Sequence, residues 1–202
     1  MGSYYNIDAI LTDAQKVPCK FSLDIPGLGY LDDNAGGDIK KDVSISLPLW
    51  LYAILSVQRI GPASAALCEL DLPPSLSPRV LNALKADAKT VDLRALCGHF
   101  YEFSTRVLEL YPYVQEAEDM TDLLSEAFQK RAREIGDHAN NLRGALGEGA
   151  HFLRGLDEME RQRESVLGQG KLCLTDDSIV FRAAHDSSKA TRVWMGEMKK
   201  KS

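Results

Sequence analysis

Apolar and polar residues alternate along two short segments in the first part of the chain, residues 19–25 and residues 43–47. The apolar positions are Cys19, Phe21, Leu23 and Ile25 in the first segment and Val43, Ile45 and Leu47 in the second. Alternation with a period of two is typical of a strand with one buried face, and the Asn- and Gly-rich residues 33–37 favour a turn between the segments. With a short helix expected over residues 6–13, the pattern predicts a small antiparallel β unit over residues 1–46.

After Pro48 the apolar residues recur every three or four positions, which is the spacing of one helix face. Residues 49–55 are apolar on all sides, which predicts a helix buried against several neighbours. Further helices are expected from Pro78 onward and over residues 92–111, 120–142 and 151–167, because glycine, proline or a capping residue bounds each of them. The chain is therefore predicted to be mainly α with a small N-terminal β-rich domain (α+β), in which a helical bundle domain over residues 47–170 follows the β unit.

The C-terminal residues 171–202 lose this periodicity, and we expect them to form a mobile tail. Residues 182–202 contain six basic and two acidic residues. Over the whole chain of 202 residues, however, 24 basic residues stand against 29 acidic ones, whereas a free-standing nucleic-acid binder usually shows a basic balance or stripe. The 45% hydrophobic and 26% charged residues are ordinary for a globular protein and exclude wholesale disorder.

Cysteine usage and the N-terminal segment indicate an intracellular protein. The four cysteines lie far apart in the sequence, so free thiols in the reducing cytosol or nucleus are expected, although the count alone also allows two disulfides. No apolar run approaches the ~20 residues of a membrane-spanning helix, and the first residues lack the basic and apolar regions of a secretory signal. We therefore expect no membrane contact.

None of the short motifs that carry catalytic or cofactor chemistry is complete in this sequence. Residues 147–152 begin like a dinucleotide-binding loop but lack its third glycine, and Cys97 and His99 have no further zinc ligands at a workable spacing. The acidic cluster over residues 157–160 has arginines three or four positions away, which predicts ordinary ion pairs on a solvated helix face. The expected pairs are Asp157–Arg161, Arg154–Glu158 and Glu160–Arg163. We accordingly expect no catalytic residue, no metal site and no cofactor.

Two of the expected helices carry more apolar surface than a single buried face requires. The residues concerned are Leu49, Trp50, Leu51 and Ile54 in one helix and Phe100, Tyr101 and Phe103 in the other. A helix with two apolar faces buries one of them within its own fold, and the other completes a central position or meets a partner chain. The pattern indicates an obligate subunit of a larger complex.

Several segments resemble those of one known family, in the same order and with similar spacing, across about residues 1–161. The matching segments are Tyr4–Leu11, Val17–Phe21, Asp24–Leu31, Ser46–Leu51, Val91–Leu93, His99–Tyr101 and Leu156–Glu160. Together they resemble the third Psf subunit (Partner of Sld Five, subunit three) of the eukaryotic GINS DNA replication complex, and the segment from Asp24 to Leu31 resembles its fungal members. The residues after Gly170 match the family poorly.

This resemblance implies a nuclear, chromatin-associated scaffold without enzymatic activity. Proteins similar to this one form a heterotetramer of four related GINS subunits, each with a helical domain and a small β-rich domain. The tetramer joins the MCM ring and its Cdc partner to form the active replicative helicase (CMG) for initiation and elongation of DNA replication, and it helps to connect the leading-strand polymerase. ATP hydrolysis belongs to the ring, and the resemblance implies at most an indirect or weak contact of this subunit with DNA.

The candidate structural or interface positions are all apolar residues. For each of them, packing in the core of its own chain is the alternative role. Those expected to hold the helical domain together and to support the subunit interface are Leu49, Trp50, Ile54, Phe100, Tyr101, Leu156 and Met159. Those expected to dock the β unit are Phe21, Ile25 and Leu28. Two other functions stay open: a small helical enzyme whose site combines distant residues such as Asp92, His99 and Glu102, and direct DNA binding through Lys199–Lys201.

Overall fold

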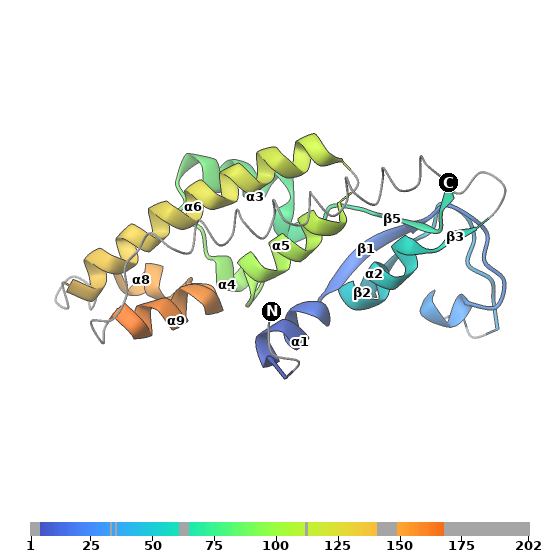
Figure 1. Cartoon of the computed structure of the whole chain (residues 1–202), viewed down its shortest axis with the longest axis horizontal. Helices are drawn as coiled ribbons and strands as arrows, with labels where there is room; N and C mark the ends of the chain where they lie inside the picture. Colours follow the sequence, from blue (N-terminus) through green and yellow to red (C-terminus); the bar gives the residue numbers. More distant parts are fainter. Residues whose placement is uncertain are drawn as a thin grey trace, which may run out of the picture. The chain divides into compact units, whose positions relative to one another are not determined.

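The computed structural model describes residues 5–32, 34, 36–60, 65–111, 113–140 and 149–167, and Figure 1 labels its elements. The chain forms two compact units: unit 1 comprises Met1–Ser77 with Leu110–Pro112, and unit 2 comprises Pro78–Glu109 and Tyr113–Ser202. Unit 1 therefore extends beyond the boundary expected after residue 46. The expected tail over residues 171–202, with Lys199–Lys201, lies outside the described residues. In the described part of the chain, no helix combines the length and the apolar character needed to cross a membrane.

Unit 1 is built around a three-stranded antiparallel sheet with the strand order β2-β1-β5. Its elements are α1 (Ile7–Asp13), β1 (Lys16–Phe21), the 3-10 helix η1 (Gly29–Asp32), β2 (Ser44–Pro48), α2 (Leu49–Val57), β3 (Arg59–Ile60), β4 (Ala65–Ala66), β5 (Cys68–Leu70) and the 3-10 helix η2 (Pro74–Leu76). Strands β3 and β4 form a separate antiparallel pair. The expected antiparallel β unit is confirmed, and the third strand of its sheet follows α2 in the sequence.

One face of this sheet is buried, as the alternation of apolar residues predicted. Val17, Cys19 and Phe21 are the buried residues of β1, and the residues between them are more exposed. Cys19 lies opposite Ile45 of β2 and opposite Leu70 of β5, and both of these are buried as well. The three strands therefore contribute to one hydrophobic layer, and α2 contacts all three of them.

The first predicted strand ends early, at Phe21, and the chain then forms a loop that returns to β2. Ile25 still pairs with Ile39 in an isolated antiparallel bridge, with N···O distances of 2.8 and 3.0 Å. Gly29 lies so close to the Gly37 carbonyl oxygen that a Cβ atom there would meet it at 2.4 Å. Only glycine fits at this close approach, which fixes how the loop folds back.

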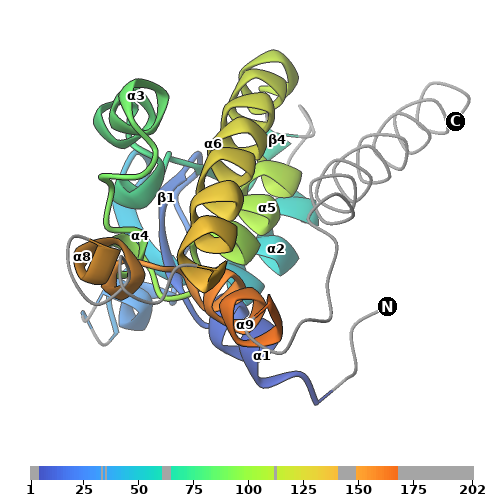
Figure 2. The same cartoon turned by 90° about the vertical axis from the view of Figure 1, so that its left-hand side faces the viewer.

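Unit 2 is a bundle of helices, as the apolar spacing predicted. Its helices are α3 (Pro78–Ala86), α4 (Leu93–Leu96), α5 (Phe100–Leu110), α6 (Val114–Asn140), α8 (Gly149–Arg154) and α9 (Glu158–Leu167). In both views α9 (orange) lies beside the C-terminal half of α6 (Figures 1 and 2), and α3 contacts α6 as well. The long helix begins at Val114, before the expected start at residue 120, so that Asp119 lies within it rather than capping it.

Two of the expected helices are each divided into two shorter ones. The helix expected over residues 92–111 is split into α4 and α5, because Cys97 has an extended backbone with φ −162° and ψ 134°. The helix expected over residues 151–167 is split into α8 and α9 by residues 155–157. Both splits fall where the two segments contact each other, so they have a common cause in the packing of unit 2.

Candidate interaction surface and buried polar core

Helices α1 and α2 of unit 1 expose a set of large apolar side chains. We call this set the α1–α2 apolar surface; it consists of Ile7, Ile10 and Leu11 of α1 and Trp50, Ile54 and Val57 of α2. On α2 the exposed fractions of Trp50, Ile54 and Val57 are 50%, 55% and 75%. Because these three residues are spaced by four and three positions, they share one face of the helix. Leu49 and Tyr52 are buried, so α2 is apolar both toward its own unit and toward solvent.

The local sequence fixes both helices that carry this surface. The Asn6 side chain caps α1 by accepting a hydrogen bond from the Asp8 N–H at 3.1 Å, as an N-cap residue does. Helix α2 follows β2 without a loop, and Pro48 is both the last strand residue and the helix cap. The Leu49 N–H donates to the Gln15 carbonyl at 2.9 Å, which ties the start of α2 to the segment after α1. The two helices also contact each other.

The predicted site residues of unit 1 differ in their exposure. The structure buries Phe21 and Leu49, partly buries Ile25 and Leu28, and exposes Trp50 and Ile54. The expectation that residues 49–55 are buried on several sides is therefore wrong for one face of α2. The helix also belongs to unit 1 rather than to the helical domain to which it was assigned. Val57 was missed, although its spacing from the two other exposed residues of α2 was a signal for it.

The core of unit 2 contains a fully buried arginine, Arg131 of α6. A guanidinium has five N–H groups, and here each of its nitrogens donates to oxygens. Nε and Nη2 donate to the two carboxylate oxygens of Glu160 at 2.7 and 2.9 Å, and Nη2 also donates to the Gly155 carbonyl at 3.2 Å. Nη1 donates to the carbonyls of Ala88 and Val91 at 2.8 and 2.9 Å. The charge is thus buried with its hydrogen bonding complete, as a buried ion requires.

Glu160 of α9 is equally buried and accepts hydrogen bonds from several elements. Besides Arg131, the Tyr101 hydroxyl donates to Oε1 at 3.3 Å, and the Asp157 N–H donates to Oε2 at 3.1 Å. Burial and the neighbouring Glu160 carboxylate raise the pKa of Tyr101 well above its ordinary value, so the phenol remains a donor. Burial lowers the pKa of Arg131, but the hydrogen bond with Glu160 and the attraction of the neighbouring acidic groups together outweigh it and raise the pKa overall. The two charges therefore form a structural ion pair that joins α6 to α9.

Asp157 supplies a second buried carboxylate beside this pair. Its Oδ1 accepts a hydrogen bond from the Phe100 N–H at 2.8 Å, although the two residues lie 57 positions apart. Asp157 thereby caps the first turn of α5 from a distant part of the chain. Burial raises the pKa of Asp157 to about 6; the Phe100 N–H opposes this shift, and the Glu160 carboxylate adds to it. Among the described residues Oδ2 has no hydrogen-bond partner, so this carboxylate is buried with only part of its hydrogen bonding satisfied.

The link between α8 and α9 explains why the expected helices are split. The Gly155 carbonyl accepts a hydrogen bond from the Leu93 N–H at 3.1 Å, and the Glu158 N–H donates to the Gly98 carbonyl at 3.1 Å. A Cβ atom at Gly155 would lie 3.2 Å from the Cα atom of Asp92, so the link packs directly on the start of α4. The link and the α4–α5 junction thus supply each other with the backbone partners that helix ends lack.

The acidic cluster over residues 157–160 is not the solvated helix face that the neighbouring arginines predicted. Asp157 and Glu160 are buried, and the partner of Glu160 is Arg131, which lies 29 positions earlier. The i,i+4 rule applies only within a continuous helix, and the helix is interrupted between Arg154 and Glu158. Glu160 lies within α9, but its side chain is buried rather than solvated. A signal was present in α6, where Arg131 occupies the same apolar stripe as Phe128. A charge on an apolar stripe indicates a buried partner.

The other predicted residues of unit 2 surround this polar core. Phe100, Tyr101 and Leu156 are buried, and Met159 is partly buried. The Tyr101 ring packs edge-to-face against Phe100 and Phe128, with ring centroids 5.5 and 4.9 Å apart. Such edge-to-face pairs stabilise a core beyond the burial of their area. In the described structure these residues therefore pack inside unit 2.

The residues considered for an enzymatic site take part in the helix structure of unit 2. The Asp92 carboxylate accepts a backbone hydrogen bond at 2.9 Å and caps α4, and the His99 carbonyl accepts the Phe103 N–H at 2.9 Å. Glu102 lies partly buried on α5. Burial raises the pKa of the Cys97 thiol, which is the opposite of what activates a nucleophile. Across the described residues, no three His, Cys, Asp or Glu side chains form a group that could hold a metal ion.

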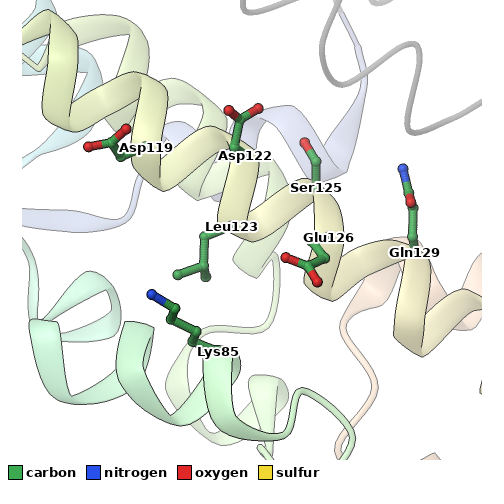
Figure 3. Close-up of a pocket in the computed structure, with 7 residues that line it drawn as sticks. All are labelled: Lys85, Asp119, Asp122, Leu123, Ser125, Glu126 and Gln129. Atoms are coloured by element: carbon green, nitrogen blue, oxygen red, sulfur yellow. The ribbon is translucent and has the colours of Figure 1, made fainter.

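A groove of about 640 Å³ runs along α6 beside α3 in unit 2 (Figure 3). It is lined by Lys85, Asp119, Asp122, Leu123, Ser125, Glu126 and Gln129. In Figure 3 the Leu123 side chain extends from α6 toward Lys85 of α3, whereas Asp122 and Ser125 point away from α3. The polar groups do not converge on one point, as they do in a small-molecule site. We therefore assign no ligand to this groove.

Two family models match separate parts of the chain. The model described as the PSF3 N-terminal domain matches residues 5–57. The model described as the GINS complex protein helical bundle domain matches residues 75–163. The second match begins close to Ser77, where unit 1 gives way to unit 2.

Curated relatives match the chain over nearly its whole length. A DNA replication complex GINS protein psf3 of Aspergillus fumigatus is 54% identical over 200 residues, which cover 98% of this chain and 99% of the relative. A DNA replication complex GINS protein PSF3 of Phaeosphaeria nodorum is 53% identical over 201 residues and covers 100% of both chains. The protein of that name from Saccharomyces cerevisiae is 32% identical over 212 residues, which cover 95% of this chain and 97% of the relative.

Proposed function

The chain belongs to the PSF3 family of DNA replication complex GINS proteins, and from this premise we propose that it is a non-catalytic scaffold subunit of the GINS heterotetramer. Other GINS subunits are its partners. The observation that supports a scaffold role is the α1–α2 apolar surface, because large apolar side chains exposed on two contacting helices of a folded unit are typical of protein–protein interfaces. In the part of unit 2 that the structure describes, the buried charges Arg131, Asp157 and Glu160 hold helices together.

The α1–α2 apolar surface is one of the interfaces with the related subunits. Tryptophan is among the residues that carry the largest share of binding energy at interfaces, and Trp50 is half exposed in this chain. Full burial of an exposed aliphatic side chain contributes roughly 1.5–3 kcal/mol, and covering the exposed parts of Ile54 and Val57 contributes a corresponding fraction of it. Leu49 and Tyr52 form the buried face of α2 and hold the helix in place. The helix therefore loses little conformational freedom when a partner binds.

Co-expression of the chain with the three related GINS subunits tests this interface. We expect one stable complex by size-exclusion chromatography with light scattering, and we expect the double variant Trp50→Asp, Ile54→Asp to be excluded from it. The matched control is Tyr30→Asp, because Tyr30 is another exposed aromatic residue of unit 1 that lies outside α1 and α2. A complex that tolerates the double variant as well as the control would contradict an interface at this surface.

The assembled tetramer joins the MCM ring and its Cdc partner in the nucleus, on chromatin, to form the active replicative helicase, and the leading-strand polymerase is connected through it. Support comes from the naming of the relatives as DNA replication complex proteins and from the acidic charge balance of the chain, which suits protein partners rather than DNA. Unwinding of forked DNA by the purified ring and Cdc partner is expected to require the tetramer. Turnover of ATP by the tetramer alone would overturn the non-catalytic role.

A further inference from the structure

In its described residues, the polar core of unit 2 contains two buried carboxylates, Asp157 and Glu160, and one buried guanidinium, Arg131. Glu160 pairs with Arg131 through both carboxylate oxygens, at 2.7 and 2.9 Å, and this pairing neutralises the guanidinium. Asp157 is left with the Phe100 N–H at 2.8 Å, while its Oδ2 has no partner among the described residues. The negative charge of Asp157 is therefore compensated by backbone N–H groups at the start of α5 and at the start of α9, and not by a cation of its own.

Among the residues that the structure describes, the elements around Asp157 supply no second buried positive charge. The ionisable groups that interact with Asp157 are Glu160 of α9, Arg131 of α6, Tyr101 of α5 and Cys97 in the α4–α5 junction. Burial raises the pKa values of both Tyr101 and Cys97, so these two groups are neutral. Glu160 repels a charged Asp157, and Arg131 is already paired. A proton on Asp157 removes both this repulsion and the desolvation cost of a buried charge.

We propose that this core is a proton-linked lock, in which Asp157 gains a proton on Oδ2 while its Oδ1 continues to cap α5 and the α8–α9 link stays docked. The pKa of Asp157, raised to about 6 mainly by burial, agrees with this geometry. The docked link is held by the bonds from Leu93 to Gly155 and from Glu158 to Gly98, each 3.1 Å long. When Asp157 loses the proton, its poorly compensated negative charge weakens the packing of the α8–α9 link on the α4–α5 junction. The inference does not depend on the proposed scaffold function.

Titration of the full chain labelled with [4-¹³C]aspartate tests whether Asp157 gains this proton. The Asp157 signal is the one that disappears in Asp157→Asn, and the signal of exposed Asp119 on α6, the matched control, is the one that disappears in Asp119→Asn. We expect the midpoint for Asp157 to lie at least about one pH unit above the ~3.9 of aspartate in model peptides. A smaller separation overturns the proposal. If Asp157→Asn does not fold, Asp157→Ser, which retains a capping oxygen, identifies the signal.

Hydrogen exchange tests whether the proton controls docking. Protection of the Phe100 and Glu158 amides, corrected for the intrinsic pH dependence of exchange, is expected to fall about tenfold or more between pH 5 and pH 7 in the unmodified chain. In Asp157→Asn, which has no charge to expose, the corrected protection is expected to stay constant over this range. Constant protection in the unmodified chain, or an equal fall in the variant, overturns the lock.

Discussion

The Arg131 guanidinium and the Glu160 carboxylate form a fully buried, two-point ion pair, although 29 positions separate them in the chain. The pair joins the middle of α6 to α9, and the hydrogen bonds from Arg131 to Ala88 and Val91 extend it to the segment before α4. A buried pair of this kind is asymmetric in its energetics: removing one partner leaves the other charge stranded in the core.

Glu160→Ala is therefore expected to lower the free energy of unfolding by about 3–5 kcal/mol. The matched control is Glu158→Ala, a partly buried neighbour on the same helix, for which we expect a loss of less than about 1 kcal/mol. The double variant Arg131→Met, Glu160→Leu should recover much of the lost stability, because it leaves no stranded charge. Urea denaturation followed by circular dichroism measures all three, and equal losses for Glu160→Ala and Glu158→Ala would contradict this account of the pair.

The contribution of Asp157 to stability is expected to change with pH in the direction opposite to that of a salt-bridged aspartate. Burial raises its pKa from 3.8 to about 6, so the folded state binds the proton more tightly than the unfolded state does. The stabilisation that the folded state gains from this proton is therefore complete below about pH 4 and is lost as the pH rises to about 6.

Asp157→Asn keeps an oxygen for the Phe100 N–H but carries no charge. We expect it to raise the free energy of unfolding by about 1–3 kcal/mol at pH 7 and to change it little at pH 4. Denaturant unfolding at both pH values checks this difference, with Asp119→Asn as the control for removing an exposed carboxylate. Greater stability of the unmodified chain at pH 7 would show that the charge of Asp157 is better compensated than its surroundings indicate.

Trp50→Ala is expected to cost far less stability than Phe100→Ala. Trp50 is 50% exposed, whereas Phe100 is fully buried. Removing a buried phenylalanine side chain costs about 3–5 kcal/mol, and we expect a loss of roughly 1 kcal/mol for the half-exposed tryptophan. Thermal unfolding of the two variants compares these losses. Similar losses would mean that the outer face of α2 supports the fold of its own unit rather than a partner.

Two glycines at the helix junctions of unit 2 provide a matched pair. A Cβ atom at Gly155 would meet Asp92 Cα at 3.2 Å, whereas a Cβ atom at Gly98 would meet nothing within 4 Å. We expect Gly155→Ala to destabilise the chain by about 1–3 kcal/mol, because the link must move away from α4. Gly98→Ala should change stability by less than about 1 kcal/mol. Denaturation midpoints measure both, and tolerance of alanine at Gly155 would show that the link is not tightly packed there.

Local patterns were sufficient to predict much of the fold. The alternation that includes Cys19 and Phe21 predicted β1, because a half-buried strand leaves its period in the sequence whatever lies opposite. The division of the long helices could not be found in this way. Asp157 caps α5 from 57 positions away, and no local spacing carries such information. A helix pattern continues through residues 97–99 in the sequence, but tertiary hydrogen bonds break it in the structure.

An exposed apolar helix face could be predicted from the sequence, but the residues that form it could not. An all-apolar segment such as residues 49–55 indicates two apolar faces, yet it does not tell which face its own unit covers. That choice depends on the strands against which the helix packs, and the third of these, β5, comes later in the chain. Burial of Leu49 and Tyr52 therefore decides which side of α2 is left for Trp50.

The position of β1 in the middle of its sheet has a consequence for expression and for truncation. Its second neighbour, β5, is not available until the ribosome has released residue 70, well past the end of the segment that matches the N-terminal family model at residue 57. In a fragment that ends at residue 57, the backbone of Cys19 and Phe21 would form an unpaired strand edge. Strands from other molecules could pair with such an edge. An N-terminal fragment therefore has to extend past Leu70, the last residue of β5, to cover this edge of β1.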